Sequence, residues 1–164
     1  MIKVLVVDDS ALVRKLFSQV LAEDADFTVA LARNGLEALA LLDSFAPDVI
    51  TLDVQMPQMD GLACLDRIMV QRPCPVVMVS SVTEAGAEAT LEALRLGAVD
   101  FVPKPAGAVS LRMHEFAPTF KEKVRAAAAA RLPATHRLRE RVLFRAGGGV
   151  PIRPARPPSK AVED

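Results

Sequence analysis

The sequence predicts an α/β fold in which a five-stranded parallel sheet lies between layers of helices. Five short apolar runs rich in β-branched residues recur between Lys3 and Pro103, and four of them are hydrophobic almost throughout. Such runs are typical of strands that are covered on both faces. Segments with apolar residues at helical spacing separate the runs. This alternation predicts right-handed βαβ units in an open, doubly wound sheet.

Each predicted element has a local basis in the sequence. We expect the strands at Lys3–Val7, Phe27–Leu31, Val49–Leu52, Pro75–Val79 and Val99–Pro103. Ser10 can cap the first helix, because its hydroxyl can accept a hydrogen bond from the first turn. Gly35 opens the second helix, Gly61 precedes the third, and Gly97 ends the fourth, since glycine is favoured just past a helix.

The first four helices are each expected to bury one apolar face against the sheet. Leucine and other apolar residues at helical spacing define these faces. They are Leu12, Val13, Leu16, Val20 and Leu21 in the first helix; Leu36, Leu39, Leu42 and Phe45 in the second; Leu62, Leu65, Ile68 and Met69 in the third; and Ala89, Leu91, Leu94 and Leu96 in the fourth.

Charge divides the chain into two units. Residues 1–120 hold 9 Lys and Arg against 16 Asp and Glu, whereas residues 121–164 hold 11 against 4, although the whole chain is neutral. A fifth helix is expected from near Leu111 through Val124 toward five consecutive alanines, and a triple glycine and a Pro-rich stretch follow. We therefore expect a globular domain at residues 1–125 and a basic linker, first helical and then disordered, at residues 126–164.

The linker leaves several partners open. Its arginines and apolar residues could dock on the acidic domain or on an effector, or pair with a second copy to give a homodimer. Nucleic acid is the least favoured partner, because the basic stretch has no interleaved aromatic residues and no helix-turn-helix pattern.

The sequence gives no sign of a membrane or secretory route. No apolar run approaches the ~18 residues of a spanning helix, and the N-terminus becomes acidic at Asp8, too early for a signal peptide. We therefore expect no membrane insertion and a cytoplasmic location. Cys64 and Cys74 have no companions that would suggest a metal site, so buried free thiols in a reducing compartment are expected.

Polar residues follow four of the predicted strands, at ends that meet on one edge of a parallel sheet. They are Asp8 and Asp9 after the first strand, Asp53 after the third, Ser80 after the fourth and Lys104 after the fifth. Any one of them could simply face water. Neighbouring carboxylates, however, repel unless a cation lies among them, and hard oxygen ligands suit Mg²⁺. A lysine favours the ionised, nucleophilic form of a carboxylate. We therefore expect Asp53 to receive a phosphoryl group.

Four stretches resemble the response-regulator receiver domain over residues 1 to about 125: VVDDSALVRKL, DVITLDVQMPQMDG, VVMVSS and GAVDFVPKP. The resemblance implies a flavodoxin-like sheet of order 2-1-3-4-5. It also implies Mg²⁺-dependent transfer of phosphoryl from a phosphohistidine of a histidine kinase to Asp53. Asp9, Asp53 and the backbone carbonyl of Gln55 would bind the metal directly, and Asp8 would act mainly through water.

The same resemblance gives roles to three further residues. Lys104 takes the place of the family's invariant lysine. Ser80 takes the place of the hydroxyl that contacts the phosphoryl group and moves when it arrives. Phe101 stands at the family's switch aromatic, and would turn into the space that Ser80 leaves.

Further details are similar to the regulatory half of the chemotaxis protein-glutamate methylesterases. These are the double serine at Ser80 followed by Thr83, and the stretch GAVDF. The resemblance implies control of a methylesterase and deamidase domain that acts on chemoreceptor glutamates. This chain carries no Gly-x-Ser-x-Gly turn, so we expect that domain to lie outside it. Two alternatives remain: the receiver of a DNA-binding response regulator, and a stand-alone receiver that works by binding proteins.

Overall fold

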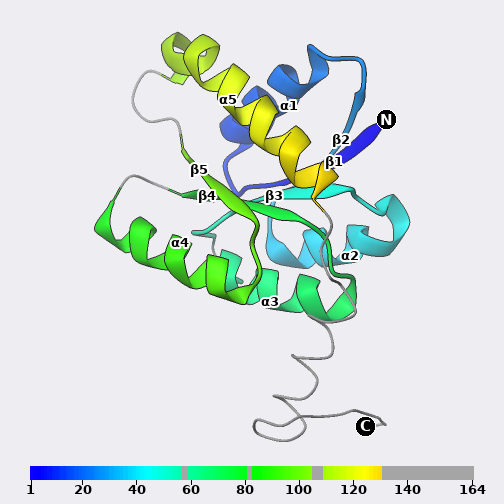
Figure 1. Ribbon diagram of the computed structural model, residues 1–164, viewed down its shortest axis with the longest axis vertical. Coiled ribbons are helices and arrows are strands. Elements are labelled where there is room, and N and C mark those ends of the chain that lie inside the picture. The colour runs from blue at the N-terminus through cyan, green and yellow to red at the C-terminus, as the bar shows by residue number, and fades with distance from the viewer. Residues whose placement is uncertain (57–58, 81–82, 105–108, 131–164) are drawn as a thin grey trace, which may run out of the picture.

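The computed structural model describes residues 1–56, 59–80, 83–104 and 109–130. Five parallel strands form one sheet in the order β2-β1-β3-β4-β5 (Figure 1). The strands are β1 (Ile2–Val7), β2 (Phe27–Ala32), β3 (Val49–Asp53), β4 (Val76–Ser80) and β5 (Asp100–Pro103). The predicted fold class and strand order are therefore confirmed.

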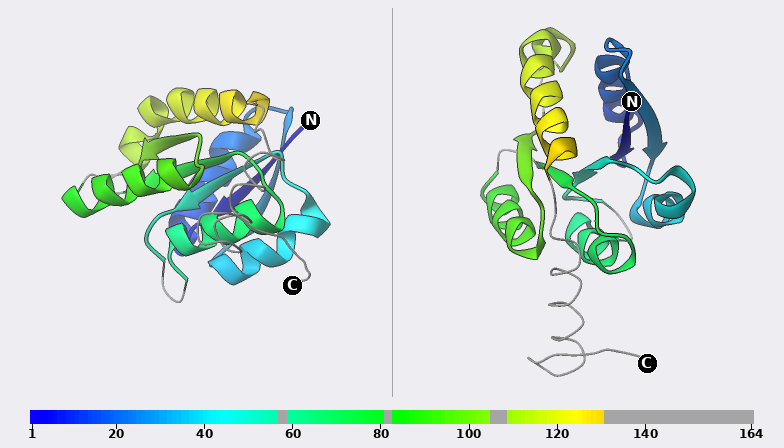
Figure 2. Two further views of the ribbon diagram at one scale, coloured as in Figure 1. Left: turned by 60° about the horizontal axis from the view of Figure 1, so that its bottom comes forward. Right: turned by 45° about the vertical axis from the view of Figure 1, so that its right-hand side comes forward.

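Helices alternate with the strands along the chain. They are α1 (Ala11–Ala22), α2 (Gly35–Phe45), α3 (Gly61–Gln71), α4 (Glu84–Leu96) and α5 (Val109–Ala129). Helices α1 and α5 cover one face of the sheet, and α2, α3 and α4 cover the other (Figure 2). Since α5 ends at Ala129 and residues 131–164 lie outside the described part of the chain, the proposed division into a domain and a linker stays a prediction.

Polar side chains set where four of the helices begin. Ser10, Asn34, Asp60 and Thr83 each have extended backbone angles, and each accepts a hydrogen bond from the backbone N–H three residues later. This is the geometry of an N-cap, which satisfies a donor that the first turn otherwise leaves free. At the other end of α4, Gly97 has φ of 122°, a conformation that favours glycine. The predicted roles of Ser10 and Gly97 are therefore confirmed.

The two faces of the sheet carry separate cores. On the α1 and α5 face, the rings of Phe17, Phe116 and Phe120 stack with centroids 4.6–5.4 Å apart. The opposite face holds both cysteines among the apolar residues of α2, α3 and β4. Both cysteines are buried free thiols, as predicted. Burial raises the pKa of Cys64 and of Cys74 to about 12, which makes both thiols poorly reactive.

Four leucines that were expected in the core are exposed instead: Leu12, Leu36, Leu91 and Leu94. In α4 the buried residues are Gly86, Thr90 and Ala93, at i, i+4 and i+7. Leu91 and Leu94 each lie one position after a buried residue, beside the buried face rather than on it, and are exposed there. The prediction placed the larger apolar residues of α4 in the core, but the buried face of this helix consists of small residues.

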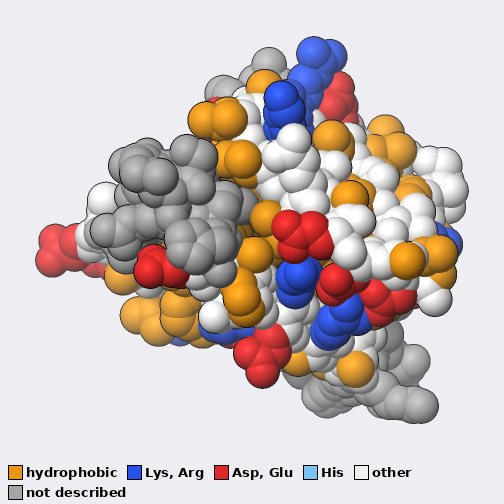
Figure 3. Space-filling view, turned by 90° about the horizontal axis from the view of Figure 1, so that it is seen from above, with side chains coloured by type: hydrophobic (Ala, Val, Ile, Leu, Met, Phe, Trp, Pro, Cys, Tyr) orange, Lys and Arg blue, Asp and Glu red, His pale blue; other side chains and the backbone are white. Residues whose placement is uncertain are grey.

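Ion pairs fasten α5 to the segment between α1 and β2. Lys121 bonds Glu23 at 3.0 Å, and Arg125 pairs with Asp24 and Asp26. Arg125 also lies over the Phe27 ring, 4.5 Å from its centroid. Figure 3 shows acidic and basic side chains next to one another on the side of the molecule that carries α1 and α5. Among the described residues, no helix has both the length and the apolar character needed to cross a membrane.

Candidate functional site

The register of the sheet brings the predicted site residues to one edge. Val7 pairs with Leu52 across β1 and β3, so Asp8 and Asp53 follow neighbouring strands at the same level. Farther along the sheet, Ser80 of β4 pairs with Pro103 of β5, and the N–H of Lys104 donates to the Ser80 carbonyl at 2.7 Å. All four residues therefore end their strands on the carboxyl side.

Three carboxylates meet at this edge. Asp8, Asp9 and Asp53 each offer an oxygen, and these oxygens all lie within 4.8 Å of one another. Asp8 is 1% exposed and Asp53 is 2% exposed, whereas Asp9 is open to solvent. The predicted cluster is therefore present, with two members buried and one at the mouth.

Lys104 is the cation among these acids. Its Nζ lies 3.0 Å from Asp53 Oδ2 and 3.3 Å from Asp8 Oδ2. The lysine side chain is partly buried, and its short distance to two carboxylates offsets part of their mutual repulsion. A single lysine charge against three acids still leaves the cluster with excess negative charge.

Backbone groups and one arginine hold the buried acids in place. The N–H of Ser10 donates to Asp8 Oδ1 at 2.9 Å, and Arg14 Nη1 donates to the Asp8 carbonyl at 2.7 Å. The N–H of Gln55 donates to Asp53 Oδ1 at 3.2 Å. One oxygen of each buried carboxylate is therefore held by a backbone N–H of its own loop. Lys104 Nζ donates to the other oxygen of Asp53, Oδ2, and also to Asp8 Oδ1 at 3.4 Å.

Burial makes the ionised form of these acids costly. Burial, reinforced by the nearby Asp8 charge, raises the pKa of Asp53 from 3.8 to about 7, although Lys104 opposes the rise. Burial also raises the pKa of Asp8. For Lys104, burial works against the charge, but attraction to Asp8 and Asp53 outweighs it and the pKa is raised. The site is therefore one in which an added cation would favour ionised acids.

The donor set fits a hard divalent cation. Asp8 Oδ2 is buried and accepts no hydrogen bond from any residue that the structure describes, although Lys104 lies nearby. Such an atom is costly unless something compensates for it. Three carboxylates offer oxygen ligands, which Mg²⁺ prefers. Gln55 has an exposed side chain, and the structure gives its N–H a bond to Asp53; the assignment of its carbonyl as a ligand stays a prediction.

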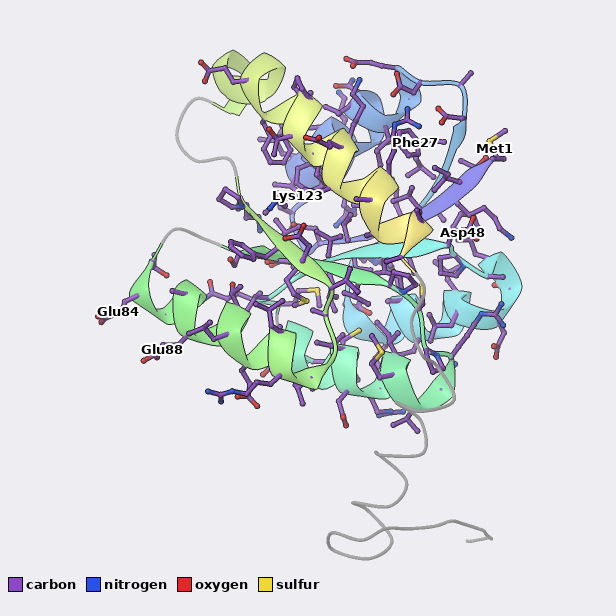
Figure 4. The ribbon with its side chains drawn as sticks, in the orientation of Figure 1. Met1, Phe27, Asp48, Glu84, Glu88 and Lys123 are labelled. Carbon is purple, nitrogen blue, oxygen red and sulfur yellow. The ribbon has the colours of Figure 1, made fainter. Side chains whose placement is uncertain are left out.

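The two predicted switch residues lie on the strands next to this cluster, Ser80 at the end of β4 and Phe101 within β5. Ser80 is 6% exposed, and its hydroxyl lies 2.9 Å from Thr90 Oγ1 of α4. Phe101 is 41% exposed, and the Lys123 ammonium lies 5.0 Å from the centroid of its ring. Lys123 also donates to the Phe101 carbonyl at 2.7 Å, and Figure 4 shows it reaching from α5 toward β5. The ring therefore lies outward in this structure.

Both switch residues line one groove, which has a volume of about 380 Å³. It runs between α4 and β5, and its walls are mostly apolar. The residues that line it include Ser80, Thr90, Leu91, Leu94, Phe101 and Pro103. On the outer surface of the same helix, Glu84 and Glu88 point away from the sheet (Figure 4). The side of α4 that faces the groove is therefore apolar, whereas its outer surface is charged.

Sequence analysis missed three residues that contact the site. Arg14 braces Asp8, Thr90 bonds Ser80, and Lys123 covers Phe101. Thr90 could have been found from the spacing of Gly86, Thr90 and Ala93, which places a hydroxyl on the buried face of α4. The partners of Arg14 and Lys123 depend on tertiary contacts, and no local signal points to them. Thr83 serves as the cap of α4, and Ser81 lies outside the described residues.

Comparison with known proteins gives matches over this whole region. Residues 4–114 match the family model of the response regulator receiver domain. The Rhodospirillum rubrum protein-glutamate methylesterase/protein-glutamine glutaminase 3 is 60% identical over 132 residues, which are 80% of this chain and 36% of that protein. The chain thus spans little more than a third of the length of this curated relative.

Solved structures give the same result. The response regulator domain of Thermotoga maritima CheB is 45% identical, with a TM-score of 0.73 over 80% of this chain and 99% of that one. The receiver domain of NtrX from Brucella abortus is 33% identical, with a TM-score of 0.63 over 77% of this chain and 99% of that one.

Proposed function

The chain belongs to the response regulator receiver domain family, and from this membership we propose that it accepts a phosphoryl group on Asp53. One observation supports this choice of residue above all. Asp53 is a buried carboxylate that ends the central strand β3, and it has two further acids and a lysine ammonium within reach.

The proposed chemistry needs an ionised Asp53. An oxygen of its carboxylate attacks the phosphorus of a phosphohistidine on a partner kinase, and the phosphorus–nitrogen bond to the histidine breaks. Lys104 favours the ionised carboxylate and lies where it can neutralise charge on the incoming phosphoryl oxygens. The Gln55 N–H holds Asp53 Oδ1, which leaves Oδ2 as the oxygen nearer to Lys104.

Mg²⁺ is the proposed cofactor. Asp8, Asp9, Asp53 and the Gln55 carbonyl would hold it. When bound, it would supply charge neutralisation for the acids and for the transferred phosphoryl group. The cluster has three carboxylates and one lysine, so it carries excess negative charge. This excess is the reason for expecting a divalent cation in the site.

The proposed output of phosphorylation is a change at the groove between α4 and β5. A phosphoryl group adds about −1.5 to −2 charge and strong acceptor oxygens. Ser80 would turn to donate to one of them, and Phe101 would move from its outward position toward the groove that both residues line. The surface formed by α4, β5 and α5 would then change for a partner.

The proposed effector is a methylesterase and glutaminase domain acting on chemoreceptors, with a chemotaxis histidine kinase as phosphoryl donor. The support is the 60% identity to a curated protein-glutamate methylesterase/protein-glutamine glutaminase and the 45% identity to the CheB response regulator domain. The likeness to the NtrX receiver is lower, at 33%. This difference favours the methylesterase effector over the other types of response regulator.

Phosphorylation of the purified chain tests the proposal. The chain is incubated with a small acyl phosphate and Mg²⁺, and the mass of the intact protein is measured. We expect a mass increase of one phosphoryl group that is lost in base, as an acyl phosphate is, and that is absent from Asp53→Asn. Asp60→Asn is the matched control, because Asp60 caps α3 and an asparagine can cap it equally well. Labelling of Asp53→Asn at the wild-type rate would refute the proposal.

A further inference from the structure

A buried hydrogen bond ties Ser80 to helix α4. Ser80 Oγ and Thr90 Oγ1 lie 2.9 Å apart, and each residue is 6% exposed. Thr90 Oγ1 also lies 2.9 Å from the carbonyl oxygen of Gly86, one turn earlier in the helix. Three oxygens therefore form a chain that runs from the end of β4 into α4.

The chemistry of the three oxygens fixes the direction of the chain. A carbonyl oxygen can only accept, so the bond to Gly86 uses the single hydroxyl proton of Thr90. Thr90 then has only acceptor capacity left for its other neighbour. Both contacts can be hydrogen bonds together only if Ser80 donates its proton to Thr90. The Ser80 proton is thus committed to α4 in this structure.

We propose that Thr90 is a positioning residue that holds the Ser80 hydroxyl turned toward α4, and that Ser80 must leave it before it can donate to a phosphoryl oxygen at Asp53. The proposal rests on the proposed function, which it deepens by naming what restrains the switch hydroxyl. Thr90 touches no carboxylate of the cluster among its described contacts, so it would act through Ser80 alone.

The restraint on Ser80 depends on whether a phosphoryl group is present, because Ser80 can donate either to Thr90 or to a phosphoryl oxygen. A hydrogen bond from Ser80 to a neutral hydroxyl is weaker than one to a charged phosphoryl oxygen. Without the phosphoryl group, Ser80 has a satisfied and buried bond to Thr90. When the phosphoryl group is present, Ser80 gains a stronger bond to a phosphoryl oxygen in place of its bond to Thr90. Thr90 keeps its own bond to Gly86. The free-energy cost of breaking the bond to Thr90 would therefore reduce the net free energy that Ser80 gains by bonding the phosphoryl group.

The position of Thr90 in the helix supports a role beyond packing. The buried face of α4 consists of Gly86, Thr90 and Ala93, and an apolar residue could fill the middle position. A helical threonine commonly bonds the carbonyl four residues earlier, which accounts for the Gly86 contact but not for the contact with Ser80. The purely structural alternative therefore predicts that only helix stability depends on the Thr90 hydroxyl.

Binding of beryllofluoride, a mimic of the phosphoryl group, separates the two alternatives. The 164-residue chain is titrated with beryllofluoride in excess Mg²⁺, and the bound species is followed by ¹⁹F NMR. We expect Thr90→Val to bind about fivefold more tightly than wild type, equivalent to about 1 kcal/mol, because Ser80 no longer leaves a partner. Thr90→Ala serves the same purpose if the valine variant does not fold. Thr90→Ser keeps the hydroxyl and should bind like wild type.

Two controls make the result specific. Thr51→Val removes another buried threonine hydroxyl, one with no hydrogen-bond partner among the described residues, and should leave the affinity unchanged. On a Ser80→Ala background, Thr90→Val should have no effect, because no hydroxyl remains to be held. The affinity for Mg²⁺ alone should be the same in wild type and Thr90→Val, since Thr90 lies outside the acidic cluster.

The outcomes distinguish failure of this inference from failure of the proposed function. If wild type binds beryllofluoride and Thr90→Val binds it equally or more weakly, Thr90 does not restrain Ser80. An effect of Thr90→Val that persists without the Ser80 hydroxyl would overturn the inference as well. If wild type itself does not bind beryllofluoride, the proposed function fails, and the inference fails with it.

Discussion

Lys104 Nζ and Asp53 Oδ2 lie 3.0 Å apart, although 51 residues separate them in the sequence. The lysine follows β5 and the aspartate ends β3, so the sheet itself brings the two together. This ion pair lowers the pKa of Asp53 and so opposes the rise that burial causes. It therefore links the fold directly to the proposed reactivity of Asp53.

Removal of the Lys104 charge should change how phosphorylation depends on pH. In Lys104→Met the Asp53 pKa should rise further above about 7, because the group that opposes the rise is gone. We expect phosphorylation to be half-maximal at a higher pH than in wild type at the same Mg²⁺ concentration. The rate below that pH should fall by about tenfold for each unit by which the Asp53 pKa rises, because the ionised carboxylate has lost its neighbouring cation. The rate with a small acyl phosphate is measured between pH 6 and 9. Lys121→Met, which removes an ion-paired lysine on α5, is the control. An unchanged pH profile in Lys104→Met would show that Lys104 does not control ionisation of Asp53.

The stability of the metal-free chain should fall as pH rises toward neutrality. Asp53 has a folded pKa of about 7 and a model value of 3.8, so between these values the folded state binds more protons than the unfolded state. Stability from this group is complete below pH 3.8 and is lost as pH rises through about 7. The free energy of unfolding should be lower at pH 7.5 than at pH 5 by on the order of 2 kcal/mol.

Urea unfolding followed by circular dichroism measures this difference, since the chain has no Trp or Tyr for fluorescence. In Asp53→Asn the dependence on pH should shrink to less than half. Added Mg²⁺ should restore stability at pH 7.5, because binding to the folded state alone stabilises it by about 2.7 kcal/mol at 100 times the Kd. A wild-type chain that is more stable at pH 7.5 than at pH 5 without metal would contradict the assignment of the raised pKa.

Much of this site could be predicted from the sequence, because it depends on strand ends. Parallel strands that alternate with helices bring their carboxyl ends to one edge, so Asp8, Asp53 and Lys104 could be grouped before any distance was known. The outward position of Phe101 and its contact with Lys123 could not. Both features depend on how α5 packs beside β5. The sequence of a helix does not indicate which side chains of a neighbouring strand it will contact.

Helix faces show the same limit on a smaller scale. Leu91 is apolar and was expected in the core, yet it is exposed, while Thr90 is polar and buried. Hydrophobic spacing predicts that α4 has an inner face, but small residues on that face shift it by one position. The spacing of small residues could have placed Thr90 on the buried face, but its hydrogen bond to Ser80 depends on how α4 packs against β4.

Two glycines at helix starts should respond differently to alanine. A Cβ at Gly61 would lie well inside contact distance of the Asp53 carbonyl and 2.7 Å from Val54 Cα, both of them rigid backbone at the proposed acceptor. A Cβ at Gly35 would meet the Met59 side chain, with Sδ at 2.7 Å, which can turn away. We expect Gly61→Ala to lower the free energy of unfolding by about 1–3 kcal/mol or more, and Gly35→Ala to change it by less than about 1 kcal/mol.

The same pair also tests whether α3 positions Asp53. Gly61 donates its N–H to the Val54 carbonyl at 2.8 Å, so a displaced helix start should disturb the loop that follows Asp53. Phosphorylation of Gly61→Ala should therefore be slower than that of Gly35→Ala at a temperature where both are folded. Equal rates in the two variants would mean that the close approach of α3 matters for packing only.

Lys123 should hold Phe101 in its outward position. Its ammonium lies 5.0 Å from the ring centroid and donates to the Phe101 carbonyl, while the ring itself is 41% exposed. A cation over an aromatic ring at an exposed site contributes about 0.5–1 kcal/mol, so Lys123→Met should shift the ratio of inward to outward rings by about two- to fivefold. The shift is read from the methyl signals of Leu91 and Leu94, because a ring that enters the groove they line changes their chemical shifts. Lys121→Met, on the same helix but paired with Glu23, should leave those signals in place. If the methyl shifts in Lys123→Met match those of wild type, the outward ring is held by its own packing, and the barrier to switching lies at Ser80 alone.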